Sequence, residues 1–185
     1  VTCVSGPCLA LARSLIMPSE AVVVRAPDGR VVVTTDMLVE GRHFRLDWSS
    51  HHDVGRKAIA QNAADIAAMG ARCTGFLVSM SCPSTTAVSD VDALTAGLWA
   101  EATRVGASIV GGDVTGGDRL VLSITALGDL EGRPPVLRSG ARPGDVLALS
   151  GPTGRSAAGW ALYEAGSATY PDLLAAHRVP TPDPA

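Results

Sequence analysis

Apolar residues recur along the chain with two spacings, one typical of helices and one typical of strands. Between residues 53 and 69, apolar side chains recur at three- and four-residue steps, and Gly70 follows as a natural helix terminator. A second helix is expected over residues 89–105, because Ser89 stands three residues before Asp92, as in a capping box. The pattern therefore predicts two long helices, each with one apolar face.

β-Branched runs predict strands that are linked by short turns. Ala21–Val24 and Arg30–Thr35 flank a Pro-Asp-Gly turn, so we expect them to pair as a hairpin that delivers Asp36 at a strand end. The other expected strands are Phe76–Met80, Ala107–Val110 and Leu120–Leu127. The last two are expected to pair, because a short turn at Gly116 and Gly117 separates them.

The order of these elements favours an α+β fold with a mixed or antiparallel sheet and helices on one face, because turns join several strands directly. Three parts are predicted: an amino-terminal segment at 1–20, a main domain at 21–140 and the start of a second domain at 141–185. The second part is expected to begin with a strand at Val146–Ser150 and a helix near Ser156–Glu164. Three prolines in Pro180–Ala185 predict a linker there.

Composition excludes several classes of protein. The net charge is −3, and the 14 Arg and one Lys are scattered, which argues against nucleic acid as a partner. No apolar run approaches the roughly 18–20 residues of a membrane span, so no membrane association is expected. The four cysteines lack a zinc-type spacing and predict free thiols of a cytoplasmic protein. No GxxxxGK[ST] phosphate-binding loop occurs.

Three acidic residues end or interrupt apolar elements. These are Asp36, Asp65 and Asp113. A carboxylate in such a setting needs a cation or hydrogen-bond donors, and Mg²⁺ prefers carboxylate oxygens. From spacing alone, the three residues are equally compatible with turns and an exposed helix face. Gly111 and Gly112 likewise predict either a close approach to a phosphate or a simple turn.

Asp65 also belongs to a polar stripe on the first predicted helix. Lys57, Gln61 and Asp65 lie at i, i+4 and i+8, so they share one face amid alanine-rich packing. A functional face and an ordinary solvated face both explain this stripe.

Four motifs, in order along the chain, resemble successive motifs of the thiamine-monophosphate kinases. They are TTDMLVEGRHF at 34–44, KAIAQNAADIAAMGA at 57–71, IVGGD at 109–113 and LRSGARPGD at 137–145. These kinases belong to the superfamily of aminoimidazole ribonucleotide synthetase, selenophosphate synthetase and a hydrogenase maturation factor. The resemblance runs from about Val22 to Pro182, and it implies the fold of the aminoimidazole ribonucleotide synthetase amino-terminal domain.

The resemblance implies Mg²⁺-dependent transfer of the ATP γ-phosphoryl group to thiamine monophosphate, which gives thiamine diphosphate and ADP. No residue is assigned a covalent catalytic role, because phosphoryl transfer chiefly needs alignment and charge neutralisation. By position, the implied metal residues are Asp36, Asp65, Asp113 and Thr35, the ATP-binding residues are Gly112, Asp113 and Arg138, and the substrate-binding residue is His43. We expect the carboxylates of the three aspartates to lie within about 10 Å of each other. A cytoplasmic homodimer, with the two amino-terminal sheets joined in a barrel, is also implied.

Two departures from the family pattern bear on activity. The family has a metal-binding Gly-Asp-Asp-Ala motif where this chain reads Pro18-Ser19-Glu20-Ala21, so Glu20 replaces at most one carboxylate. The family's second domain extends well past the position of Ala185. We therefore expect the chain alone to bind magnesium-ATP weakly and not to turn over. A catalytically inactive nucleotide-binding or dimerisation module, and another ATP-using member of the superfamily, are the alternatives.

Overall fold

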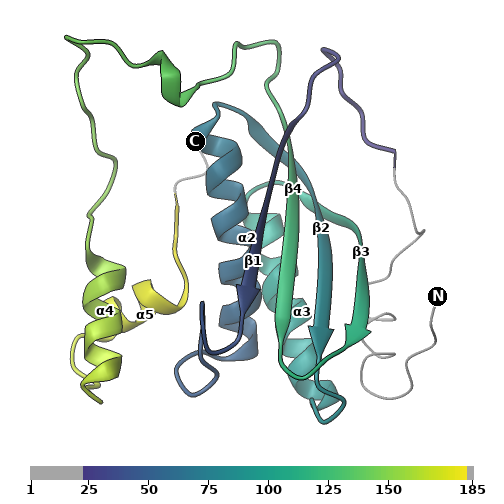
Figure 1. Ribbon diagram of the computed structural model, residues 1–185, viewed down its shortest axis with the longest axis vertical. Helices are drawn as coiled ribbons and strands as arrows, with labels where there is room; N and C mark the ends of the chain where they lie inside the picture. Colours follow the sequence, from purple (N-terminus) through teal and green to yellow (C-terminus); the bar gives the residue numbers. More distant parts are fainter. Residues whose placement is uncertain (1–22, 183–185) are drawn as a thin grey trace.

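A computed structural model describes residues 23–182, which form one four-stranded sheet, two long helices and a pair of shorter helices (Figure 1). The strands are β1 (Val32–Val39), β2 (Arg72–Cys82), β3 (Ser108–Gly116) and β4 (Val121–Asp129). The helices are α2 (His51–Ala68), α3 (Val88–Arg104), α4 (Arg155–Glu164) and α5 (Pro171–Arg178), with a 3-10 turn at Arg138–Gly140. None of the helices within this described part is long and apolar enough to cross a lipid bilayer.

The sheet is mixed and has the strand order β1-β4-β2-β3. β2 and β3 are parallel, whereas β4 is antiparallel to both β1 and β2. The parallel strands β1, β2 and β3 are linked through α2 and α3, as parallel connections require, and both helices cover the same face (Figure 1). The predicted α+β fold with a mixed sheet and helices on one face is confirmed.

Both predicted strand pairings are wrong. β1 pairs with β4, while Val23 and Val24 have no regular structure and Ala21 and Val22 lie outside the described residues. β4 does not pair with β3, although only a short turn separates them. The reason is burial: Leu122 and Ile124 of β4 are 0% exposed, and a central position under α2 removes more apolar surface from water than an edge position.

Several predicted boundaries also need correction. Asp36 lies within β1 and not at its end. α3 begins at Val88 after the N-cap Ala87, so Ser89 is not the cap. Val146–Ser150 forms no strand, because this segment has no neighbouring strand to pair with in the described part of the chain. The helix near 156–164 is confirmed as α4.

The ends of α2 show how local sequence fixes the element. The Ser50 side chain accepts a hydrogen bond from the Asp53 backbone N–H at 3.1 Å, and the Asp53 carboxylate accepts one from the Ser50 N–H at 3.3 Å, which makes a complete capping box. At the other end Gly70 has φ +73°, the left-handed conformation that glycine adopts without strain. The predicted terminator is confirmed, whereas the Ser50 cap was missed.

The core lies between the sheet and the two long helices. Its largest fully buried side chains are Phe76, Leu38, Ile59, Ile66, Leu94, Leu98, Leu122, Ile124, Glu101 and Val54. Glu101 is the charged member of this set. Its carboxylate accepts from Arg56 Nε at 2.9 Å and from Arg104 Nε at 2.5 Å, so one buried acid links α2 to α3. A buried charge needs such partners to avoid a cost of several kcal/mol.

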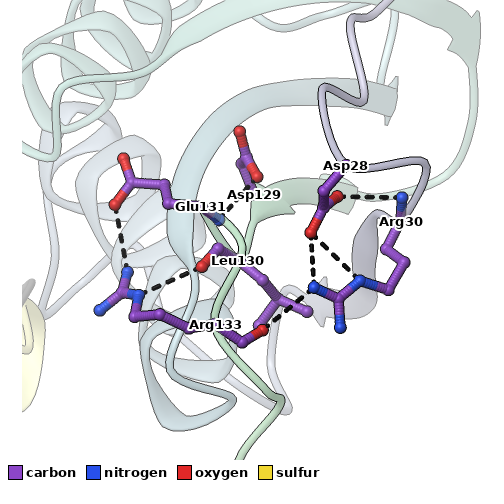
Figure 2. A network of polar contacts seen from close by, with 6 residues as sticks. All are labelled: Asp28, Arg30, Asp129, Leu130, Glu131 and Arg133. Carbon is purple, nitrogen blue, oxygen red and sulfur yellow. Dashed lines mark hydrogen bonds and ion pairs between the residues drawn. The ribbon is translucent and has the colours of Figure 1, made fainter.

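A surface network fastens the turn before β1 to the loop after β4 (Figure 2). Arg30 donates to Asp28 Oδ2 at 2.6 Å and to the Arg133 carbonyl oxygen at 3.2 Å. Arg133 in turn donates to the Glu131 carboxylate at 3.2 Å. The hydrogen bond from Arg30 also holds the pKa of Asp28 below its usual value. The network thus joins the entrance of β1 to the exit of its neighbour β4.

Helices α2 and α3 touch backbone to backbone at two glycines. A Cβ at Gly97 would overlap the carbonyl oxygen of His52, and a Cβ at Gly55 would overlap the carbonyl oxygen of Leu94. The overlap involves backbone atoms, so no side-chain rotation relieves it. Any side chain at either position must therefore push the helices apart.

We predict that Gly97→Ala lowers the free energy of unfolding by at least about 2 kcal/mol, because overpacking outweighs the roughly 1 kcal/mol that alanine contributes in a helix. Denaturant unfolding followed by circular dichroism measures this. Gly140→Ala is the control, since a Cβ there meets no atom within 4 Å. Equal stability of Gly97→Ala and the wild type would contradict the backbone contact.

Candidate functional site

The polar stripe of α2 faces β1 and the loop that follows it. Thr34 Oγ1 donates to Asp65 Oδ2 at 3.1 Å, and Lys57 Nζ donates to the His43 carbonyl oxygen at 2.7 Å. Between them, the buried Gln61 Oε1 has no hydrogen-bond partner among the described residues. Burial lowers the pKa of Lys57. The stripe is therefore in contact with β1 and its following loop through Asp65 and Lys57, while the Asp65 side chain stays exposed to solvent.

Asp36 lies on the same face of β1 as Thr34, because alternate strand residues point to the same side. In register it faces Ile124 of β4, which is fully buried beneath the helices. Asp36 and Asp65 thus both lie on the helix-covered side of the sheet near the β1 edge. Their carboxylates and the unpartnered Gln61 oxygen are the hard oxygen donors that suit Mg²⁺.

Asp113 lies elsewhere on the sheet. It is in register with Ser79 of β2. Ser79 is paired with Ser123 of β4, and Ser123 is paired with Met37 of β1, so all four residues point to the same face of the sheet. Met37 and Asp36 are consecutive, so Asp113 points to the face opposite Asp36. β1 and β3 are the two edges, and three strand spacings of about 4.8 Å separate them by about 14 Å.

The single chain therefore does not bring the three aspartates together as predicted. Accordingly, no group of three or more His, Cys, Asp or Glu residues able to hold a metal occurs within residues 23–182. No sequence pattern indicated that Asp113 and Asp36 point to opposite faces of the sheet, because the direction of Asp113 depends on a bulge. The pairing of β2 with β3 shifts between Phe76 and Leu77, so that the side chain of each following residue of β3 is reversed.

Gly112 lies inside β3 and not in a turn. Its φ is +154°, and a Cβ there would overlap the carbonyl oxygen of Val78. A glycine is therefore required for β3 to pair with β2 directly after the bulge. This explains Gly112 by strand packing, while its contact with a nucleotide stays a prediction.

Thr35 and Arg138 differ in whether their polar atoms already form hydrogen bonds or ion pairs within the fold. Thr35 Oγ1 donates to the Ile124 carbonyl oxygen at 3.0 Å, so its hydroxyl proton is committed to the sheet. Arg138 is exposed in the 3-10 turn, and its guanidinium makes no hydrogen bond or ion pair with the described residues. Their proposed roles, like that of Glu20, which lies outside the described residues, stay predictions.

His43 is held in one tautomer by the loop that follows β1. Its Nδ1 accepts a hydrogen bond from the Val39 backbone N–H at 2.9 Å. Because this nitrogen accepts, the proton of the neutral ring must be on Nε2. The His43 side chain is exposed, so Nε2–H is a donor available to a ligand.

A cavity of about 410 Å³ lies beside His43, between the loop after β1 and helices α4 and α5. Its lining residues are Gly41, Arg42, His43, Phe44, Arg45, Trp48, Trp160, Glu164 and His177. Sequence reasoning identified only His43 in this set. The available signal was the rarity of aromatic residues, since a chain with 4% Phe, Trp and Tyr places two of its three Trp here.

Aromatic stacking positions the two short helices against this loop. The Trp48 and Tyr163 rings stack with centroids 4.9 Å apart, and Arg45 lies 4.3 Å over Trp48. Arg178 donates to the Tyr163 hydroxyl at 2.7 Å and forms an ion pair with Asp53 at 3.4 Å. These contacts fix one wall of the cavity relative to the other.

Comparison with known proteins adds the family. Residues 18–130 match the model of the AIR synthase related protein, N-terminal domain. Thiamine-monophosphate kinase of Mycobacterium tuberculosis is 57% identical over 163 residues, which are 88% of this chain and 49% of that protein. The Corynebacterium glutamicum kinase is 49% identical over 156 residues, which are 83% of this chain and 47% of that protein. The chain thus spans about half the length of these curated relatives.

Solved structures give the same result. The structure described as AaThiL complexed with AMPPCP and TMP matches with a TM-score of 0.79 and 31% identity, over 85% of this chain and 52% of that one. Thiamine monophosphate kinase from Aquifex aeolicus matches with a TM-score of 0.78 and 30% identity, over 92% of this chain and 59% of that one. Both matches extend beyond the sheet, because each covers more residues than β1 to β4 span.

We predict that acid loosens the contact between His177 and the loop. Its imidazole packs edge-on against Trp48 at 6.0 Å, and burial, assisted by the charge of Lys57, lowers its pKa. The pKa of His177 in the folded protein is below its unfolded value of about 6.5. The contribution of the neutral imidazole to the free energy of unfolding is therefore complete above about pH 6.5 and is lost as pH falls through the folded pKa.

Urea unfolding at about pH 7.5 and about pH 5 measures this effect. His177→Asn is the test variant, because an amide can still donate to the Ser156 carbonyl oxygen but does not titrate. The loss of stability between the two pH values should be smaller in the variant. An equal loss in both proteins would contradict the role of His177.

Proposed function

The chain belongs to the family of AIR synthase related proteins through its amino-terminal domain, and on this basis we propose that it is the ATP- and acceptor-binding half of a thiamine-monophosphate kinase. The observation that carries the proposal is the 57% identity with the M. tuberculosis kinase over 88% of this chain. The match covers the segments that hold Asp36, Asp65, Asp113, Arg138 and His43. Residues 21–140 then form the nucleotide-binding domain, and residues 141–185 begin a second domain.

In the proposed reaction, an oxygen of the thiamine monophosphate phosphate attacks the γ-phosphorus of ATP. The bond from that phosphorus to the β,γ-bridging oxygen breaks, ADP leaves and thiamine diphosphate forms. Donor and acceptor are both anionic, so the site must neutralise charge and align the two phosphates. The solved complex of AaThiL with AMPPCP and TMP supports the binding of both molecules by one protein of this fold.

Asp36 and Asp65 would hold Mg²⁺ on the helix-covered side of the sheet, with Glu20 as a further candidate ligand. The side chain of Thr35 points to the opposite face of β1, so Thr35 would contribute through its backbone. The bound metal would supply positive charge to the phosphates. Asp65 already accepts from Thr34, which fixes its carboxylate at the β1 edge. Arg138, with no partner among the described residues, would reach the ATP phosphates through its guanidinium.

Asp113 would join the nucleotide site only in a homodimer. None of the helices within residues 23–182 covers its side of the sheet, and Val33 and Met37, on the same side, are each 55% exposed. A second sheet packed on this face would cover both residues and place Asp113 at the subunit interface. This supports the homodimer that the resemblance implies.

We place the protein in the cytoplasm, where ATP is available as co-substrate. The buried thiol of Cys73 supports this location. Cys73 is free, and burial raises its pKa to about 11, so that the thiol stays protonated at neutral pH. Cys3 and Cys8 lie outside the described residues.

A catalytically inactive nucleotide-binding module is the second candidate. The observation that favours it is the separation of Asp113 from Asp36 and Asp65 within one chain. In that case ATP binding would persist without transfer to an acceptor. Only a measurement of phosphoryl transfer to the acceptor distinguishes this candidate from an active kinase.

We predict that a chimaera, in which this chain replaces the matching half of the M. tuberculosis kinase, converts thiamine monophosphate and ATP to thiamine diphosphate and ADP. Asp65→Asn in the chimaera should lower kcat/KM about 100-fold or more, because a charge needed in the transition state is lost. Asp172→Asn, an exposed acid of α5 outside the four motifs, is the matched control and should retain activity.

A coupled assay of ADP release, with thiamine diphosphate measured by chromatography, gives the result. A folded chimaera that binds ATP but forms no thiamine diphosphate would contradict the kinase and favour the inactive module. Full activity of Asp65→Asn would contradict the metal role of Asp65.

A further inference from the structure

The cavity beside His43 has three polar or aromatic groups, Trp160, Glu164 and His43, whose binding capacity the described contacts leave partly free. Trp48 is already stacked between Tyr163 and Arg45, so its ring faces are occupied. Trp160, by contrast, is 53% exposed and has no aromatic partner among the described residues. An exposed indole on a cavity wall is a platform for a flat ring.

Glu164 offers an acceptor on the same wall. It lies one turn after Trp160 on α4, so the two side chains share a helix face. Within residues 23–182, its single ion pair is a distant 3.9 Å contact with Arg45, whose guanidinium is bound more closely to Asp47 at 2.7 and 3.0 Å. The Glu164 carboxylate therefore keeps most of its capacity to accept hydrogen bonds.

His43 offers a donor from the opposite wall. The Val39 N–H bond fixes its proton on Nε2, as described above. The cavity thus presents an aromatic face, a carboxylate acceptor and an imidazole N–H donor around about 410 Å³, a volume suited to a small ligand. Arg42, also in the lining, adds positive charge at the same site.

We propose that this cavity binds a planar heteroaromatic ring that carries an amino group. The ring stacks on Trp160, the amino group donates to Glu164, and a ring nitrogen accepts from His43 Nε2–H. This inference rests on the proposed function, because the aminopyrimidine of the thiamine acceptor has this set of groups. It adds Trp160 and Glu164 as residues that select the acceptor.

The test is a titration of thiamine, without phosphate and without ATP, into the full 185-residue chain by isothermal titration calorimetry. Trp160→Ala should weaken binding about tenfold or more, since stacking on an aromatic residue contributes at this scale. Trp160→Phe keeps a ring and should retain most of the affinity. Glu164→Gln should weaken binding about tenfold, because a charge-assisted hydrogen bond becomes a neutral one.

Two matched controls and one ligand control sharpen the result. Tyr170→Ala removes an exposed aromatic residue that does not line the cavity, and Glu131→Gln removes an exposed acid that does not line it either. Both variants should bind thiamine like the wild type. Glu164→Gln should not change the affinity for unsubstituted pyrimidine, which has no amino group.

Absence of thiamine binding, or unchanged binding by Trp160→Ala, would overturn the proposal. The readout needs neither ATP nor turnover, so it is independent of the kinase test. An inactive chimaera together with Trp160-dependent thiamine binding would support the cavity and reject the kinase. An active chimaera, together with unchanged thiamine affinity in Trp160→Ala, would support the kinase and reject the proposed role of the cavity.

Discussion

The direct contact between the backbones of α2 and α3 is the constraint on which the rest of the structure depends. Gly55 and Gly97 let two helices lie side by side on a sheet of only four strands, and buried Glu101 then fastens them through two arginines. With α2 held in this position, its polar stripe lies against β1 and the loop that follows it. Asp65 and Lys57 can then fix Thr34 and the His43 carbonyl group. The packing of two glycines thus determines where the candidate site forms.

The local features of the fold were predictable, because they depend on neighbouring residues. The helical spacing located α2 and α3, and Gly70 marked the end of α2. Strand order was not predictable in the same way, because pairing is decided by burial between distant segments. The turn at Gly116 and Gly117 suggested that β3 and β4 pair, whereas the apolar content of β4 places it in the centre of the sheet.

The candidate site shows the same division. The four motifs identified Asp36, Asp65 and His43, and the structure places all three along β1 and the adjoining face of α2. Asp113 could not be placed from sequence, because a bulge of one residue in β3 decides which side of the sheet it faces. The Trp160 wall was equally hidden, since it depends on how α4 packs against a loop more than 100 residues earlier in the chain.

The segment before α4 has a consequence for the behaviour of the protein in solution. Val146 and Leu147 are 91% and 99% exposed, and they belong to a run that reads as a strand but has no partner among the described residues. An unpaired apolar segment of this kind is a template for strand addition between molecules. Self-association at high concentration would then begin at this short stretch, and a single charged residue there would be the gatekeeper that protects colloidal stability.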